Sequence, residues 1–470
     1  MKKFISIALV FCLAMTAFLF VGCAKNPNTN IKLDGGPELN ELVTGNGSFQ
    51  VRKGDYVYFA SGYVSKSDLG TGGLTNELGE VTNGALYRAK VELKKTLIKE
   101  DDKKPEGEKS EPKYQEEYVL TDVQLLCSKL VGFENSGIYI FGNKIYFGTP
   151  STIKNKQGQV MYKLLTFYSV DLNGENLTEL YQTQSFENGK YSFISINGNL
   201  YLMIFDGSQI LRVDMNGNSK VLATDVTSAV LPKSEVVADN SYSATENEKY
   251  VYYTTKNSKN TETIDYGNVL NKVNIVSGEK TELFKKEYIK ITLNKFENNK
   301  LYYKRNVMLS EMSASSQTYL FTNDFSKTNF EESEKQIANQ SAITNMVEYK
   351  YEAEELDGYT YVNGGKLYYR SSDGLTVKTL STSASSVLFV QGKYVYYVSS
   401  SAIYRVDVTK DNPSGQKLSD SSTINTSYIT IDSNFIYFYV KDSKTSVYET
   451  YYVDLINFVS GTTKPVKIVG

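Results

Sequence analysis

The 470-residue chain has no histidine and no tryptophan, and it has few cysteines (3) and prolines (8). Without histidine it cannot build a Ser-His-Asp triad, a Cys-His pair or a histidine general base. A zinc site is unexpected, because Cys127 is the one cysteine in the body. No G-x-x-x-x-G-K-[ST] phosphate loop occurs either. We therefore expect no metal or other cofactor, and our leading hypothesis is that the protein is not an enzyme.

A strong charge of either sign is also missing. The formal net charge is −2 at pH 7, and it becomes −4 when Lys2 and Lys3 are removed with the leader described below. Lysine and acidic residues are spread along the chain, so there is no basic surface for nucleic acid and no polybasic patch for anionic lipid.

The N-terminus carries the most specific motif in the sequence. Lys2 and Lys3 precede an apolar run over residues 4–20, and Phe20-Val21-Gly22-Cys23 resembles a lipobox. Cleavage after Gly22 would free Cys23 to carry diacylglycerol and palmitate. We expect residues 1–22 to be a lipoprotein signal peptide and Cys23 to be the lipid attachment site, which places the protein on the extracytoplasmic face of the cell membrane. The run is short for a spanning helix of ~20 residues. An uncleaved anchor and an ordinary signal peptide are the alternatives.

Two segments can be separated after the leader. Residues 23–45 are polar and rich in Asn, Gly and Pro, which predicts a lipid-anchored flexible tether. Residues 46–470 form the body, which we expect to be one domain and a monomer. Hydrophobic residues make up 41% of the chain, enough for a large core.

The body repeats a triplet with tyrosine between two apolar or aromatic residues. The eight copies are Val57-Tyr58-Phe59, Ile145-Tyr146-Phe147, Leu200-Tyr201-Leu202, Val251-Tyr252-Tyr253, Leu301-Tyr302-Tyr303, Leu367-Tyr368-Tyr369, Val395-Tyr396-Tyr397 and Ile436-Tyr437-Phe438. Side chains alternate along a strand, so residues 394–398 are apolar or aromatic on both faces. A sheet of such strands must be covered on both sides. A second β-branched strand follows most copies, as in residues 403–407.

Periods of roughly 40–50 residues with several strands each are typical of propeller blades. We therefore predict an all-β fold, a β-propeller of seven or eight blades, with eight preferred. A string of β-sandwich domains and other all-β folds are the alternatives. Only 28 residues separate Tyr368 from Tyr396, which is too short for four full strands and predicts a stunted blade there.

These motifs resemble those of a known family. Tyr252-Tyr253-Thr254-Thr255 and residues 403–407 (IYRVD) are similar to the YWTD propellers of the low-density-lipoprotein receptor class, and to TolB-like propellers and the propeller domains of bacterial surface lipoproteins. Tyr, Phe or Leu stands where the YWTD family has Trp. The resemblance implies a propeller fold and a role in binding a protein or another ligand.

Two insertions interrupt the repeat. In residues 99–117, thirteen of the nineteen residues are Lys, Asp or Glu and two are Pro, so we expect a solvated loop or an interaction loop. Residues 323–349 form the second insertion, where we expect one short helix.

Asp171-Leu172-Asn173-Gly174 and Asp214-Met215-Asn216-Gly217 share a D-x-N-G pattern. An EF-hand loop needs its Gly at the sixth position, whereas Asn-Gly pairs suit type I′ hairpin turns. We therefore predict turns here and no calcium.

Three functions remain after these exclusions. The first is a non-enzymatic binding or interaction module for a protein, peptide or glycan, and it is the function that we prefer. The alternatives are a carbohydrate-active enzyme with paired carboxylates and a transporter-associated solute-binding lipoprotein. The sequence does not identify the ligand-binding residues.

Overall fold

The computed structural model describes residues 31–65, 83–97, 114–161, 163–186, 189–232, 236–237, 244–256, 266–286, 288–297, 299–308, 314–324, 333–338, 346–419 and 423–469. Strands dominate, and they form eight antiparallel sheets. The only helices in these ranges are two 3-10 turns, η1 (Asn247–Lys249) and η2 (Glu352–Glu354). Within the same ranges, no helix has the length and hydrophobicity that crossing a membrane requires.

The sheets follow one another along the chain, and seven of them have four strands. The first sheet, which has six, contains β15 (Val236–Val237), β1 (Val43–Thr44), β2 (Gln50–Lys53), β3 (Tyr56–Ala60), β4 (Ala85–Leu97) and β5 (Tyr114–Leu130). The second contains β6 (Ile138–Phe141), β7 (Lys144–Pro150), β8 (Leu165–Asp171) and β9 (Thr178–Gln182). The third contains β10 (Lys190–Ile196), β11 (Asn199–Phe205), β12 (Ile210–Asp214) and β13 (Ser219–Ala223). The fourth contains β14 (Val226–Val230), β16 (Tyr250–Thr255), β17 (Val269–Asn274) and β18 (Lys280–Lys285).

The second half of the chain repeats this plan. The fifth sheet contains β19 (Ile289–Glu297), β20 (Lys300–Met308), β21 (Ala314–Asp324) and β22 (Lys335–Ala338). The sixth contains β23 (Met346–Tyr351), β24 (Leu356–Asn363), β25 (Lys366–Ser371) and β26 (Val377–Ser381). The seventh contains β27 (Ser386–Gln391), β28 (Tyr394–Ser399), β29 (Ala402–Asp407) and β30 (Gln416–Lys417). The eighth contains β31 (Ile424–Ile431), β32 (Phe435–Lys441), β33 (Tyr448–Asp454) and β34 (Val466–Lys467).

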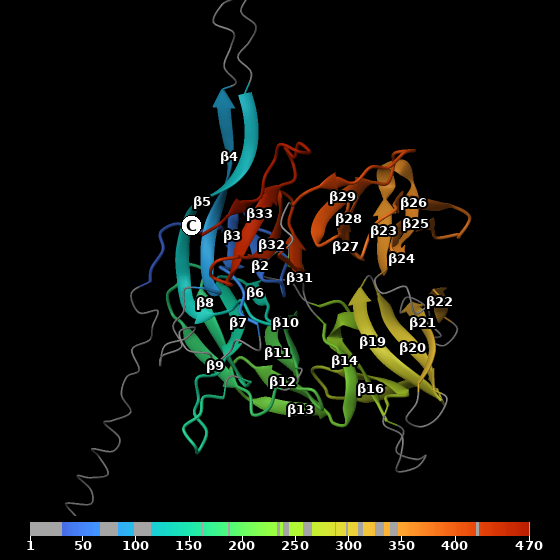
Figure 1. Ribbon diagram of the computed structural model, residues 1–470. Helices are drawn as coiled ribbons and strands as arrows, with labels where there is room; N and C mark the ends of the chain where they lie inside the picture. Colours follow the sequence, from blue (N-terminus) through green and yellow to red (C-terminus); the bar gives the residue numbers. More distant parts are fainter. Residues whose placement is uncertain are drawn as a thin grey trace, which may run out of the picture.

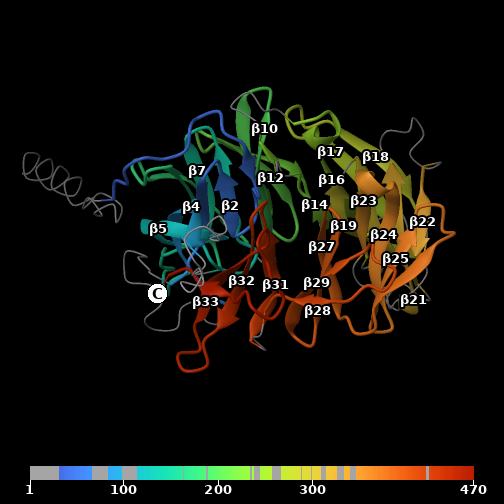
Figure 2. The same cartoon turned by 90° about the horizontal axis from the view of Figure 1, so that it is seen from above.

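The eight sheets stand in order around a ring, with the last beside the first (Figures 1 and 2). The predicted all-β, propeller-like fold is therefore confirmed. Separate sandwich domains do not fit this arrangement, because one hydrophobic cluster joins the first, second and eighth sheets through Val57, Ile145 and Tyr437.

Burial on both sheet faces holds the ring together, as the strand composition predicts. In β28 the alternating residues Val395, Tyr396 and Tyr397 are all at most 2% exposed. Tyr396 packs in the cluster between the seventh and eighth sheets, whereas Val395 and Tyr397 pack toward the sixth. Burying large side chains on both faces contributes about 1.5–3 kcal/mol per residue, so each sheet depends on its neighbours.

The expected stunted blade is wrong. In the first sheet, strands β2 to β5 correspond to the four strands of each other sheet. Counted in this way, seven of the eight triplets lie on the second strand of their sheet, whereas Leu367-Tyr368-Tyr369 lies on β25, the third strand of the sixth sheet. β24 supplies the second strand there, with Tyr359 and Tyr361 in the equivalent run. The short spacing to Tyr396 thus reflects a shifted triplet, and both sheets have four strands.

Side chains of the first and last sheets close the ring. The Thr450 hydroxyl donates to the Ala60 carbonyl at 2.6 Å and accepts from the Gly62 amide at 2.7 Å. Nearby, Arg52 Nη1 lies 3.7 Å from Asp432 Oδ2. The Asp432 carboxylate also accepts the Tyr437 hydroxyl at 3.0 Å, and burial raises its pKa.

Both predicted insertions contribute strands to the sheets. Residues 98–113 lie outside the described residues, but 114–117, the end of the first insertion, begin β5 and pair with the end of β4. In the second insertion, β22 completes the fifth sheet and β23 begins the sixth. The described residues of 323–349 contain no helix, so the expected helix is not found there.

Candidate functional site

The two site residues predicted from the sequence, Gly22 and Cys23, lie outside the described residues. Cys127 is fully buried in β5, and burial raises the pKa of its thiol to about 12. A protonated, inaccessible thiol is a poor nucleophile. Cys127 is therefore a packing residue of the core.

The segment that follows the predicted lipid site is bound to the body. Leu33 donates its amide to the Asn173 carbonyl at 2.8 Å, and Lys32 forms an ion pair with Glu175 at 3.1 Å. Both acceptors belong to the turn between β8 and β9 in the second sheet. Ile31 lies against Gly174 of the same turn, where an added Cβ would come within 2.7 Å of the Ile31 side chain.

Two buried cations hold the next part of this segment by its backbone. Arg88, 1% exposed in β4, donates to the carbonyls of Asp34 at 2.7 Å and Gly35 at 2.9 Å. Its guanidinium also lies over the Tyr56 ring, 5.1 Å from the centroid. Lys53, also 1% exposed, donates to the carbonyl of Leu39 at 2.9 Å, and burial lowers the pKa of its ammonium group.

The segment ends as a strand. β1 pairs with β2 on one side and with β15 on the other. β15 lies between β14 and β16 in the sequence, although those two strands belong to the fourth sheet. Val43 in β1 is 1% exposed. Residues 31–45 are therefore a packed arm on the first and second sheets, and the expected flexible tether is wrong for this part.

The Asn-Gly turns differ from the type I′ prediction. At Asn173-Gly174 and Asn216-Gly217, the glycines alone have positive φ, +89° and +82°. The Asp214 carboxylate instead accepts the backbone amides of Asn216 and Asn218, both at 2.9 Å. Both central residues have positive φ at Asn197-Gly198, as type I′ requires.

In the described part of the chain, no group of three or more Cys, Asp or Glu side chains is placed to hold a metal ion.

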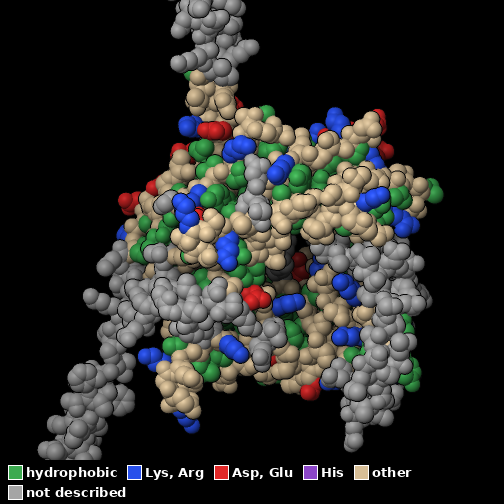
Figure 3. Space-filling model, viewed as in Figure 1, with side chains coloured by type: hydrophobic (Ala, Val, Ile, Leu, Met, Phe, Trp, Pro, Cys, Tyr) green, Lys and Arg blue, Asp and Glu red, His purple; other side chains and the backbone are tan. Residues whose placement is uncertain are grey.

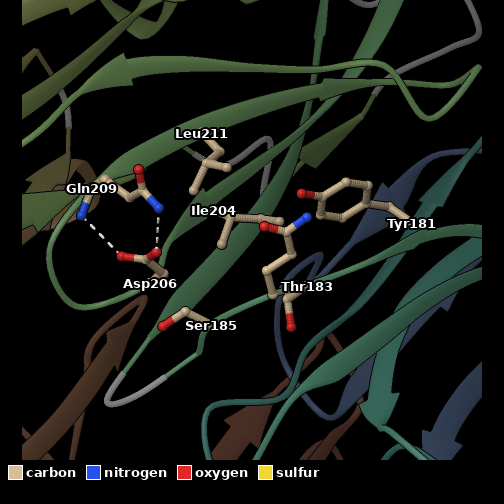
Figure 4. A pocket seen from close by; sticks show the side chains of 8 residues that line it. Tyr181, Thr183, Ser185, Ile204, Asp206, Gln209 and Leu211 are labelled. Atoms are coloured by element: carbon tan, nitrogen blue, oxygen red, sulfur yellow. Dashed lines mark hydrogen bonds between the residues drawn. The ribbon is translucent and has the colours of Figure 1, made fainter. Parts of the chain in front are cut away.

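A small cavity lies between the second and third sheets, where the chain leaves β9 and where β11 turns into β12 (Figure 4). It encloses about 40 Å³, room for one or two water molecules. The lining residues are Tyr181, Thr183, Gln184, Ser185, Ile204, Asp206, Gln209 and Leu211.

The chemistry of this cavity is limited. Asp206 is its one carboxylate, and it accepts the Gln209 amide and side chain, both at 2.9 Å, and the Ser208 amide at 2.9 Å. Its oxygens thus shape the β11–β12 turn. A glycosidase needs two carboxylates about 5–9.5 Å apart, so this cavity does not favour that alternative. Figure 3 shows a second hollow at the middle of the face, bordered by acidic and basic side chains.

A hairpin of β4 and β5 extends beyond the body (Figure 1). β4 pairs with β3 only as far as Lys90, yet it pairs with β5 out to Leu97 and Tyr114. We call residues 92–97 and 114–118 the ribbon. Among the described strands, β5 alone pairs with residues 92–97, so the opposite edge of β4 is open there.

The two faces of the ribbon differ in polarity. One face carries the cross-strand pairs Leu93–Tyr118 and Leu97–Tyr114, with Lys95–Glu116 between them. Leu93, Leu97 and Tyr114 are 40%, 52% and 51% exposed. The other face carries the Lys94–Glu117 and Thr96–Gln115 pairs. A two-stranded ribbon is marginally stable alone in water, and its apolar face has no covering element among the described residues.

Comparisons with known proteins show similarity at the level of structure. No protein-family model matches the chain, and no curated protein matches it. Apo AztD from Citrobacter koseri matches over 76% of this chain and 92% of its own, at 12% identity and a TM-score of 0.41. An oligogalacturonate lyase in complex with manganese matches over 67% and 86%, at 12% identity and a TM-score of 0.39. A prolyl endopeptidase matches over 60% of this chain, which spans only 42% of that protein, at 13% identity and a TM-score of 0.38.

Proposed function

We propose that the protein is a lipid-anchored extracytoplasmic binding module, an eight-bladed β-propeller in which each sheet is one blade. The leader, the lipobox and Cys23 support the anchoring, because they follow the order that a lipoprotein signal requires. The binding role is non-enzymatic, and its partner is a protein.

The observation that carries the binding role is the ribbon. Its apolar face exposes two leucines and a tyrosine at the end of a hairpin held at its base by the closed ring. Tyr118 and Leu120 donate their amides to Asp454 Oδ2 at 2.8 Å and to the Tyr452 hydroxyl at 3.3 Å, so the eighth sheet fixes the base of the hairpin. A rigid base with an exposed recognition segment is typical of binding proteins.

A protein partner suits the ribbon better than a glycan does. The open edge of β4 offers backbone donors and acceptors to an added strand, and Leu93 and Leu97 offer apolar contacts next to it. Lys94 and Lys95 of β4 are already paired with Glu117 and Glu116 of β5, so a partner strand along this edge needs no excess charge of either sign. We propose that the partner adds an extended segment along this edge.

Photo-crosslinking from neighbouring positions tests this proposal. A photoreactive phenylalanine at Leu97 probes the apolar face, and the same residue at Thr96 probes the polar face of the same strand. We expect the probe at Leu97 to give one protein adduct of defined mass. The yield of this adduct should be at least fivefold lower with the probe at Thr96. The adduct should be lost when Tyr114→Ser is combined with the probe at Leu97. Equal adducts from both faces, or an adduct indifferent to Tyr114→Ser, would show that the apolar face is not the binding surface.

A further inference from the structure

The packed arm makes the connection between Cys23 and the body short. Residues 24–30 are all that separate Cys23 from Ile31, the first residue held on the second sheet. A fully extended chain spans at most ~3.6 Å per residue, so this connection reaches about 29 Å at most. If the whole of 24–45 were free, as the composition predicts, it would reach about 80 Å.

This difference decides whether the body can turn over above a membrane. A compact domain of this length has a radius of gyration of about 22 Å, which corresponds to a sphere of radius about 29 Å. Suppose that this sphere rests on the bilayer surface. If the attachment point at Ile31 lies no more than about 29 Å above that surface, it lies in the half of the sphere that faces the bilayer. A reach of about 80 Å would exceed the diameter of the sphere and would allow any orientation.

The strength of the arm's attachment supports the shorter reach. To lengthen the connection, the chain must release the Leu33–Asn173 hydrogen bond, the Lys32–Glu175 ion pair and the two carbonyls bound by Arg88. Release would leave the Arg88 guanidinium, 1% exposed, without these two acceptors. Leaving a buried charged donor unpaired is unfavourable.

We propose, on the basis of the lipid anchoring proposed above, that the second sheet faces the bilayer and the sixth faces away from it. The bilayer-facing surface is the rim made by the arm and the turn 171–176. Lys32 pairs there with Glu175, and Lys144 pairs with Asp171 at 2.6 Å, but the arm also carries Asp34, Glu38 and Glu41, so the rim is net acidic. The short connection, and not the charge of the rim, therefore sets this orientation. The second and sixth sheets lie on opposite sides of the ring in both views (Figures 1 and 2).

Energy transfer to the membrane tests this orientation. The acylated full-length protein is placed in vesicles with an acceptor dye on the lipid headgroup, and a donor dye is attached at Thr178→Cys or at Leu375→Cys. Thr178 lies in β9 of the second sheet, and Leu375 is 86% exposed in the sixth. Cys127 is buried and does not compete for the dye. We expect at least threefold more efficient transfer from Thr178→Cys.

A matched control lengthens the connection without touching the arm. Twenty Gly/Ser residues inserted between Asn30 and Ile31 should bring the two transfer efficiencies within a factor of 1.5. Equal transfer from both positions in the acylated protein without the insertion would overturn the orientation and leave the anchoring intact. A chain that carries no lipid and stays off the membrane would overturn the anchoring and the orientation together.

Discussion

Arg88 Nη2 donates a 2.7 Å hydrogen bond to the backbone carbonyl of Asp34, 54 residues earlier in the chain. The two residues join the arm to the third strand of the first sheet's core. The same arrangement recurs where Arg405 Nη1 donates to the Leu455 carbonyl at 3.1 Å, from the seventh sheet to the eighth. A buried arginine on a third strand is thus a connector between neighbouring parts of the ring.

Replacing this arginine should loosen the arm. Arg88→Met removes two charge-assisted hydrogen bonds, each of which contributes about 1.5–3 kcal/mol. We expect the free energy of unfolding in urea to fall by about 3 kcal/mol or more, and proteolytic cleavage within residues 31–42 to accelerate at least tenfold. Arg370→Met, at an exposed arginine on β25, is the control and should change both by little. Unchanged cleavage in Arg88→Met would mean that the arm is held by other contacts.

Two buried tyrosines should respond in opposite ways to loss of the hydroxyl. The Tyr191 hydroxyl donates to the Gly137 carbonyl at 2.8 Å and accepts the amides of Gly137 at 2.8 Å and Gly148 at 3.1 Å. Tyr191→Phe leaves these groups unpaired and should destabilise the protein by about 2–3 kcal/mol.

The control for that substitution is Tyr439→Phe. Tyr439 is fully buried, and its hydroxyl has no hydrogen-bond partner among the described residues. Its removal should leave the free energy of unfolding unchanged or raise it slightly. Equal destabilisation by the two variants in urea unfolding would contradict the assigned hydrogen bonds.

The same tyrosines predict a loss of stability in alkali. Burial raises the pKa of Tyr191 to about 12, whereas a tyrosine in the unfolded chain titrates near its ordinary 10.0. Above pH 10 the folded state therefore binds more protons than the unfolded state, and stability falls as pH rises. For Tyr191 alone the loss reaches about 1.4 kcal/mol by pH 11 and about 2.3 kcal/mol by pH 12. Urea unfolding at pH 9, 10 and 11 measures it, and a flat profile would contradict it.

The sequence predicts the ring better than the arm, and the reason lies in where each signal is carried. Val395, Tyr396 and Tyr397 predict a sheet covered on both faces, because consecutive side chains point to opposite faces and all three are apolar or aromatic. The shifted triplet at Leu367 misleads because its residues fit a third strand as well as a second.

The arm is recognised through its backbone, which composition does not reveal. Asp34 and Gly35 are held by their carbonyls, and both residues are typical of a loose linker. The available signal was Arg88 itself, a charged residue between apolar neighbours in a strand whose two faces are buried. The sequence does not predict the ribbon, because the glutamates of residues 114–117 place these residues in the charged insertion.

Closure of the ring should depend on Thr450. Thr450→Val keeps the shape of the side chain but removes the hydroxyl that joins Ala60 and Gly62 to the eighth sheet. We expect a loss of about 1–3 kcal/mol in the free energy of unfolding, because the Gly62 amide remains buried without its acceptor. Thr423→Val, at an exposed threonine that precedes β31, is the control. A smaller loss for Thr450→Val than for Thr423→Val would contradict this role.

The anchoring at Cys23 is measured most directly by metabolic labelling with a clickable palmitate analogue. We predict that the wild-type chain takes up the label and stays with the membrane fraction, and that Cys23→Ser takes up none and is released or retains its leader. Equal labelling of both chains, or an unlabelled wild-type protein found in the medium with its leader cut elsewhere, would contradict lipid anchoring at Cys23.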